Sequence, residues 1–392
     1  MDRTFAWVIW IGILSTFVLG SHYYLWLRLV RDTSLSAQPK MLATLLLIAL
    51  GVCMLAGPFI AHQYPYGMAL WGMRLAYSWL GMVFFLIMLF WLKDSLHFLY
   101  FLSKKIQLVT AADLEADRRL FLQRIVHGGI ALTGLGIGGL ALKKRQKIHI
   151  KEVQVKLSRF PKALNGFRLV QWSDVHVGLE TARAAIADLV EQTNALKPDL
   201  VAITGDFVDA DVSVLASKVA ALQNLQSRFG VFFVTGNHEY YHGADAWLAE
   251  LGRLGVRVLR NEAVEIGTAP ESFMLAGVDD ASAYRLASGH GADFEKACGQ
   301  CDKDKEIVLL AHQPKAIYQA QKYPVGLQLS GHTHGGQIWP FNFFVRLSQP
   351  FVRGLHAYKE MQIYVSSGTG TWGPPMRLGT QCEITSLKLF RA

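Results

Sequence analysis

The chain has 392 residues, and 52% of them are hydrophobic, a proportion that is high for a wholly soluble protein. Its net charge of +9 lies entirely in residues 1–150, which hold 15 of the 39 Lys and Arg but only 6 of the 30 Asp and Glu. The second part of the chain is therefore neutral. This distribution excludes a basic nucleic-acid-binding domain and is typical of a membrane protein.

Four apolar runs in the first part of the chain predict membrane spans, at residues 5–27, 41–61, 68–92 and 125–142. Basic residues such as Arg28 and Lys93 follow the first and third runs. By the positive-inside rule these loops are cytoplasmic and the N-terminus is outside. We expect a membrane region at residues 1–147 and one further domain at residues 148–392.

The hexad Arg118-Arg119-Leu120-Phe121-Leu122-Gln123 resembles the twin-arginine export consensus, and the run after it contains six glycines. Either a twin-arginine signal or an ordinary fourth helix anchored by the two arginines would place the second domain outside. Lys143, Lys144, Arg145 and Lys147 favour the opposite orientation, because basic residues prefer the cytoplasm. A domain on the inner face is therefore an alternative.

From residue 148 onward, short apolar runs alternate with helical spacing, which predicts a layered α/β domain. The predicted helices cover residues 181–195, 213–229 and 240–254. The predicted strands cover residues 148–157, 166–173, 199–204, 231–235, 273–278, 306–311, 325–330, 364–367 and 383–390.

Polar residues directly follow five of these strands. They are Asp174 and His176, Gly205-Asp206, Gly236-Asn237-His238-Glu239, His312, and Gly331-His332-Thr333-His334. Because ligands in layered α/β folds gather outside the carboxyl ends of strands, we expect these side chains to meet. On an extended segment His332 and His334 would point the same way.

Seven of these side chains are candidate metal ligands: Asp174, His176, Asp206, Asn237, His312, His332 and His334. Mixed nitrogen and oxygen ligands suit Mn, Fe or Zn. Seven ligands are too many for one ion, and Asp206 is the candidate bridge between two. Two cations about 3.5–4 Å apart can hold a hydroxide that attacks phosphorus in line. His238 is placed to protonate the leaving oxygen.

The five blocks resemble the ordered signature of the calcineurin-like metallophosphoesterase superfamily: Asp174-x-His176, Gly205-Asp206-x-x-Asp209, Gly236-Asn237-His238-Glu239, His312 and Gly331-His332-x-His334. The resemblance implies a four-layer β-sandwich flanked by helices. It also implies one metal on Asp174, His176, Asp206 and His334, and a second on Asp206, Asn237, His312 and His332. Asp206, Asn237 and His238 would be the catalytic residues.

Within the superfamily, the blocks around Asp174, His312 and His332 look like the branch of membrane-anchored bacterial phosphodiesterases and transmembrane proteins with a metallophosphoesterase domain. The apolar runs predict a multi-pass protein, and the resemblance implies the bacterial inner membrane, where we expect the catalytic domain to lie on the outer face. We expect hydrolysis of a phosphodiester or pyrophosphate of a lipid-linked or envelope substrate, without a nucleic-acid partner. The sequence indicates no oligomeric state. The alternatives are a cytoplasmic-facing UDP-2,3-diacylglucosamine pyrophosphatase of lipid A synthesis and a non-catalytic membrane sensor or scaffold.

Several further residues carry open interpretations. The aromatic stretch at residues 339–345 could dock a lipid tail or a bilayer, or it could pack inside the domain. Arg346, Arg353 and Arg377 are candidates for a second phosphate contact or are ordinary exposed charges. Cys298 and Cys301 could form a local disulfide if the domain is exported or remain free thiols if it is not.

Overall fold

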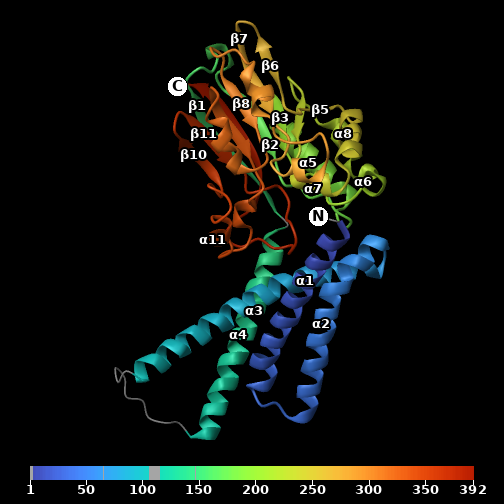
Figure 1. Cartoon of the computed structure of the whole chain (residues 1–392), viewed down its shortest axis with the longest axis vertical. Helices are drawn as coiled ribbons and strands as arrows, with labels where there is room; N and C mark the ends of the chain where they lie inside the picture. Colours follow the sequence, from blue (N-terminus) through green and yellow to red (C-terminus); the bar gives the residue numbers. More distant parts are fainter. Residues whose placement is uncertain (1–2, 65, 106–114, 146) are drawn as a thin grey trace. The chain divides into compact units, whose positions relative to one another are not determined.

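The computed structural model describes residues 3–64, 66–105, 115–145 and 147–392, which form two compact units (Figure 1). One unit comprises Met1–Lys143 with Gly373–Met376, and its elements are helices. The other comprises Lys144–Trp372 with Arg377–Ala392 and holds every strand of the described residues.

The helical unit contains α1 (Arg3–Trp26), α2 (Ala37–Gln63), α3 (Met68–Lys105) and α4 (Ala116–Lys144). Among the described residues, three helices are long and apolar enough to cross a membrane, and these lie within α2, α3 and α4. They correspond to the second, third and fourth predicted spans. The first predicted span is also helical, but α1 is not one of these three, so the expected count of four is approximate.

Large apolar side chains on these helices remain exposed, as expected for surfaces that face lipid rather than water. Leu46, Trp91 and Leu132 are examples. Polar contacts join the helices to one another within the unit. The Arg28 guanidinium pairs with Asp94 of α3 at 2.9 Å, and His127 of α4 lies 2.6 Å from the Arg28 carbonyl through its Nδ1.

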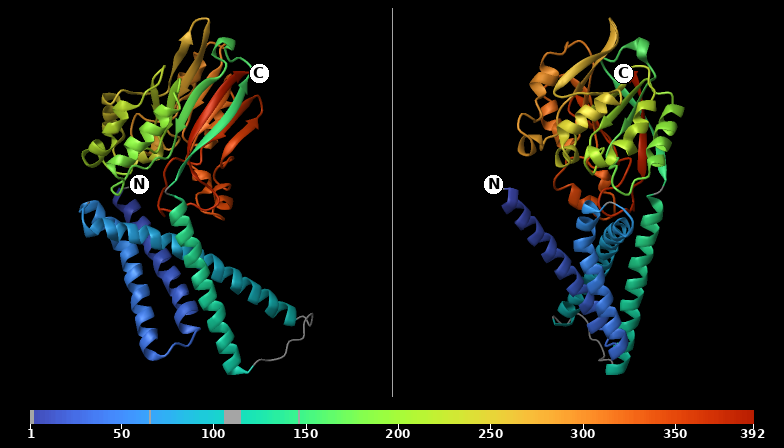
Figure 2. Two further views of the ribbon diagram at one scale, coloured as in Figure 1. Left: turned by 180° about the vertical axis from the view of Figure 1, so that it is seen from behind. Right: turned by 90° about the vertical axis from the view of Figure 1, so that its right-hand side faces the viewer.

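The other unit is built on two six-stranded sheets, and Figure 2 shows them from two further sides. The first sheet has the order β1-β12-β2-β3-β4-β5 and the second has the order β10-β11-β9-β8-β7-β6. The strands of the first sheet are β1 (Ile148–Leu157), β12 (Cys382–Arg391), β2 (Phe167–Trp172), β3 (Leu200–Thr204), β4 (Val231–Val234) and β5 (Val256–Val258). Those of the second are β10 (Gly354–Tyr358), β11 (Met361–Val365), β9 (Val325–Ser330), β8 (Ile307–Leu310), β7 (Glu271–Gly277) and β6 (Glu262–Thr268).

Alternation along the strands places apolar side chains on both faces of each sheet. Leu169 of β2 packs between the two sheets, whereas its neighbour Val170 packs outward. The outward layer of the first sheet is covered by α5 (Arg183–Ala195), α6 (Val212–Val219) and α8 (Ala244–Arg253). The outward face of the second sheet is covered in part by α10 (Ile317–Ala320). The predicted α/β sandwich flanked by helices is therefore confirmed.

Parallel pairing brings several strand ends to the same edge of each sheet. Strands β2, β3, β4 and β5 run parallel to one another in the first sheet, and β7, β8, β9 and β11 do so in the second. The carboxyl ends of parallel neighbours lie side by side, so the residues that follow them can converge.

Three strands were absent from the sequence prediction, and each is at the edge of its sheet: β5, β6 and β10. Edge strands are short or carry polar residues, so their apolar pattern is weak. The predicted helix at residues 213–229 is also shorter, because α6 ends at Val219 and a 3₁₀ segment, η3 (Ala220–Asn224), follows it.

Candidate metal centre

The predicted site residues lie just beyond strand ends, as predicted from the sequence, at an offset of two or three residues. Asp174 follows β2, Asp206 follows β3, Asn237 follows β4, His312 follows β8 and His332 follows β9. All seven candidate ligands are largely buried, and the structure brings six of them into two adjoining groups.

The first group consists of Asp174, His176 and His334, whose ligand atoms lie within 4.8 Å of one another. The Nε2 atoms of His176 and His334 are 3.0 Å apart, and His334 Nε2 is 3.5 Å from Asp174 Oδ1. The Asp174 carboxylate also accepts the backbone N–H of His332 at 2.9 and 3.0 Å. This contact ties the β2 end to the loop after β9.

The second group consists of Asp206, His312 and His332, again within 4.8 Å. His312 Nε2 lies 3.1 Å from Asp206 Oδ2 and 3.2 Å from His332 Nδ1. The same Asp206 oxygen is 3.9 Å from Nε2 of His176 in the first group. The carboxylate of Asp206 therefore lies between the two groups, which is the position of a bridging ligand.

Asn237 is the seventh candidate. Its Oδ1 is buried and has no hydrogen-bond partner among the described residues. A buried amide oxygen without a partner is costly unless it meets a cation or a donor. Its loop is held by Glu239, whose carboxylate accepts the backbone N–H groups of Gly236 at 2.7 Å, Phe207 at 2.7 Å and Asp206 at 3.0 Å. Burial raises the pKa of Glu239 to about 7.

Asp209 has a role that the sequence reasoning did not assign, although the residue closes the Gly-Asp-x-x-Asp block. Its Oδ1 lies 2.8 Å from Nδ1 of His176 and 2.7 Å from Nδ1 of His238. A carboxylate accepting both Nδ1–H groups fixes the tautomer of each ring and leaves both Nε2 atoms directed at the site. The position of Asp209 three residues after a candidate ligand is the signal that could have found it.

The backbone of the site is unusual. Five candidate ligands have a positive φ: Asp174 (52°), His176 (51°), Asp206 (51°), His332 (68°) and His334 (50°). Left-handed backbone at residues other than glycine is uncommon and clusters at functional sites. The expectation of an extended segment at His332 and His334 is therefore wrong. The two imidazoles do not point the same way, and each joins a different group.

Gly331 explains why the loop after β9 can approach the loop after β2. A Cβ at position 331 would clash with Ser173 Oγ and Asp174 Oδ2. Only glycine allows this approach without displacing a candidate ligand.

The pKa values of the imidazoles are shifted in opposite directions. Burial alone would lower the pKa of His176, but the carboxylate on its Nδ1 raises it to about 9. Burial also opposes protonation of His312, yet Asp206 raises its pKa well above the usual value. Burial lowers the pKa of His332 to about 4 and that of His334 well below the usual value. Each group therefore pairs one ring of raised pKa with one ring of lowered pKa.

This arrangement fits divalent cations. In each group two imidazole nitrogens lie 3.0 or 3.2 Å apart, and both can bind a cation when they carry no proton. The orphaned Asn237 Oδ1 and the shared Asp206 oxygen add oxygen ligands to the nitrogens. A mixed set of imidazole, carboxylate and amide suits transition metals such as Mn, Fe or Zn.

Arg377 differs from both sequence interpretations, since it is neither a phosphate contact nor an exposed charge. Its side chain is fully buried, and it donates to the backbone carbonyls of His334 and Ser367 at 2.7 Å and to those of Gly368 and Gly370. It holds the loop of His334 against the loop before β12. Arg346 and Arg353 are exposed.

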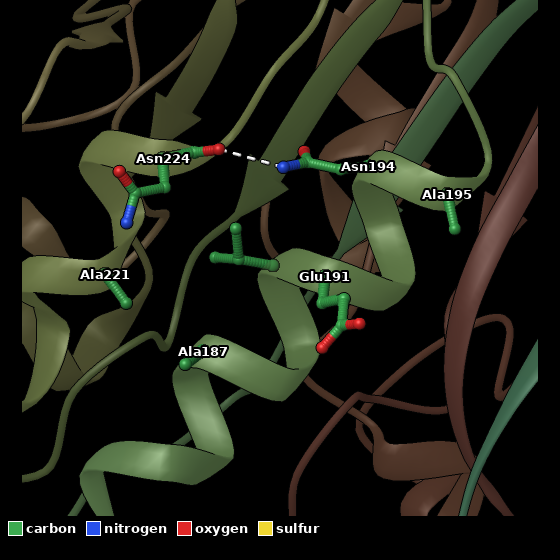
Figure 3. Close-up of a pocket in the computed structure, with 7 residues that line it drawn as sticks. Ala187, Glu191, Asn194, Ala195, Ala221 and Asn224 are labelled. Carbon is green, nitrogen blue, oxygen red and sulfur yellow. Dashed lines mark hydrogen bonds between the residues drawn. The ribbon is translucent and has the colours of Figure 1, made fainter.

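Two other features of this unit lie outside the site. Cys298 and Cys301 are buried free thiols. Figure 3 shows a surface recess between α5 and η3 that none of the candidate ligands lines. Asn194 bridges it by donating to the Asn224 carbonyl at 2.9 Å.

Comparison with known proteins identifies this arrangement. The family model described as calcineurin-like phosphoesterase matches residues 167–336, which contain every candidate ligand. The chain is 39% identical over 349 residues to a Bos taurus protein named "Transmembrane protein with metallophosphoesterase domain", covering 85% of this chain and 76% of that protein. A Danio rerio protein of the same name is 34% identical over 400 residues, covering 97% of this chain and 88% of that protein. An "Uncharacterized metallophosphoesterase" of Helicobacter pylori strain J99 is 38% identical over 290 residues, covering 72% and 75%.

The chain belongs to the calcineurin-like metallophosphoesterase family and is a phosphoesterase, a hydrolase of phosphoric ester bonds. Within the family it is similar to proteins named as transmembrane, and the Danio rerio match extends over nearly the whole chain, helices included. Together with the apolar helices, this similarity supports association with a membrane.

Proposed function

We propose that this membrane protein hydrolyses a phosphodiester or pyrophosphate bond of a lipid-linked or envelope substrate, using two divalent ions. Asp174, His176, Asp206 and His334 would hold one ion, and Asp206, Asn237, His312 and His332 would hold the other. The observation that carries the proposal is the Asp206 carboxylate, 3.1 Å from His312 and 3.9 Å from His176, between two ligand groups.

Two divalent ions, when bound, supply the Lewis acidity that activates water at neutral pH and offsets charge on the phosphoryl oxygens. The side chains of the chain supply the remaining functions. His238 directs its Nε2 toward the site, 4.0 Å from Asp206 Oδ2, while Asp209 holds its Nδ1. A ring held in this way can contact the substrate phosphate and donate a proton to the leaving oxygen.

Two aromatic rings lie beside His238. The rings of Tyr241 and Trp372 lie edge-on to the imidazole, with centroids 5.2 and 6.0 Å away. Trp372 is itself half exposed, so an aromatic side chain beside the candidate acid lies at the surface of the domain. Aromatic side chains in this position suit a substrate whose phosphate group carries an apolar substituent.

The direct test is hydrolysis of bis(4-nitrophenyl) phosphate by the purified full chain with Mn²⁺. We expect Mn²⁺-dependent turnover that Asn237→Ala reduces by about two orders of magnitude, since the change removes a candidate metal ligand, the buried Oδ1 atom. Asn224→Ala, the same change at an exposed position on another face, is the matched control. Equal rates for the wild-type protein and Asn237→Ala would contradict the proposal and favour a non-catalytic scaffold.

We also propose that the protein is a multi-pass protein of a bacterial inner membrane with its catalytic domain on the outer face. Arg118 and Arg119 at the start of α4 support this side, because paired arginines before an apolar helix stay in the cytoplasm. A fusion of alkaline phosphatase to the C-terminus is expected to be active. An inactive fusion, with an active cytoplasmic reporter at the same position, would favour the lipid A pyrophosphatase alternative.

A further inference from the structure

A second surface feature directly follows the candidate metal loop. Residues 339–353, here called the aromatic segment, include the short helix α11 (Asn342–Val345). Five of the nine residues from Trp339 to Leu347 are large, apolar and about half exposed or more: Trp339, Phe341, Phe343, Phe344 and Leu347. Leu347 is the most open, at 86%. Single exposed apolar residues are ordinary, but a contiguous group marks an interaction surface.

The aromatic segment also borders a basic pocket of about 220 Å³. Arg346, Arg353 and His356 line it together with Trp339. Arg353 donates one Nη1–H to the Gly379 carbonyl at 2.6 Å, which fixes the guanidinium at the pocket wall. Arg346 makes no ion pair among the residues that the structure describes, and its charge is available to a ligand.

No acidic side chain balances these arginines within the loop. Residues 331–359 contain Arg346, Arg353 and Lys359 but neither Asp nor Glu. The pocket therefore attracts anions, and a guanidinium fork matches the geometry of a phosphate. Gly335 also lines the pocket, and it is the residue next to the candidate ligand His334. The basic pocket thus adjoins the candidate metal centre.

We propose that the aromatic segment is a docking surface for an anionic phospholipid bilayer, with the pocket between Arg346 and Arg353 receiving a headgroup phosphate. Aromatic and leucine side chains beside arginines are the composition of an element that lies in a membrane interface. Two arginines at an anionic surface strengthen binding by about thirty-fold.

The chain itself tethers this domain to the bilayer. Residues 145–147 alone separate the end of α4 from the start of β1, so the domain is covalently tethered to an apolar helix by a linker of three residues. Tethering raises the effective concentration of the partner, and a modest docking surface is then sufficient. A docked domain would take its substrate from the headgroup layer, and this consequence alone rests on the function proposed above.

The test uses the full chain in nanodiscs, with a fluorophore on Leu347→Cys and brominated lipids as the quencher. The matched control carries the same label on Tyr284→Cys, an exposed position of the same domain. Protein without an introduced cysteine is labelled in parallel as the background. We expect quenching at position 347 to exceed that at 284 at least three-fold in discs containing phosphatidylglycerol, and to fall in discs of phosphatidylcholine alone.

Charge-reversal variants distinguish the contribution of the pocket to lipid binding from that of the aromatic side chains. The double variant Arg346→Glu with Arg353→Glu is expected to lose the dependence on phosphatidylglycerol, whereas Arg257→Glu with Lys303→Glu, at exposed positions elsewhere, is expected to retain it. Equal quenching at positions 347 and 284 in both lipids would overturn the docking surface. A lipid dependence that survives the first double variant would overturn the phosphate pocket. Failure of the wild-type protein to hydrolyse a soluble phosphodiester would refute the proposed function and leave the fluorescence result standing.

Discussion

Asp209 makes the sharpest prediction, because one of its oxygens is shared by two rings of the site. In Asp209→Asn the amide oxygen can still accept from His176 and His238, so the change removes charge and keeps the shape. A hydrogen bond to a charged group is worth about 1 kcal/mol more than a neutral one. Two such bonds, at 2.8 and 2.7 Å, give about 2 kcal/mol, or roughly thirty-fold.

The assay is hydrolysis of bis(4-nitrophenyl) phosphate as a function of Mn²⁺ concentration, which separates metal affinity from kcat. We expect the thirty-fold loss to be divided between the two, because Asp209 orients a candidate ligand and the candidate acid. Asp211→Asn is the matched control, since it removes the same charge two residues later from a side chain that is 65% exposed. The reasoning would be refuted if Asp209→Asn stayed within three-fold of wild type in both quantities, or if Asp211→Asn lost as much.

Three further predictions concern the same centre. Removal of metal with a chelator should abolish turnover and lower the melting temperature by roughly 5–10 °C in scanning fluorimetry, because a ligand at a hundred times its Kd stabilises the folded protein by about 2.7 kcal/mol. An unchanged melting temperature would argue against a metal in the folded protein. Arg377→Lys should reduce activity by about one order of magnitude and weaken Mn²⁺ binding, because a lysine cannot donate to all four carbonyls through which Arg377 holds the His334 loop. Wild-type metal affinity in this variant would show that the loop does not need the guanidinium. Gly331→Ala should lose activity at least a hundred-fold, because the new Cβ would clash with the Asp174 carboxylate. Gly252→Ala, at a position in α8 with open space around it, should instead stabilise the fold by about 1 kcal/mol in thermal unfolding. Full activity in Gly331→Ala would show that the two loops can move apart without loss of the site.

The candidate site was largely predictable, for a physical reason. Parallel strands deliver their carboxyl ends to one edge, so Asp174, Asp206 and Asn237 could be expected to converge from their positions alone. The spacing of the Gly-Asp-x-x-Asp block could have singled out Asp209, but its two hydrogen-bond partners could not be predicted, because these imidazoles come from different loops. The burial of Arg377 likewise arises only when the loops before β12 and after β9 fold together.

The strands in the interior of each sheet could be predicted from the sequence. Interior strands such as β3 and β8 are buried on both faces and read as continuous apolar runs. Edge strand β6 carries two glutamates and a glycine, and β10 begins with a glycine, so neither presents such a run. Local geometry at His332 and His334 also escaped prediction, because tertiary contacts hold these residues in a conformation that their own side chains disfavour.

The left-handed backbone at five candidate ligands also bears on how such a chain would evolve. Each of these residues costs roughly 1–2 kcal/mol relative to a glycine in the same conformation. Folding alone would therefore favour drift to glycine or asparagine at Asp174, His176, Asp206, His332 and His334. A pseudoenzyme descended from this chain should show that drift, with a gain in stability as its metal sites decay. Glycine at these five positions would thus distinguish a relative that has become a scaffold from one that still turns over a phosphate ester.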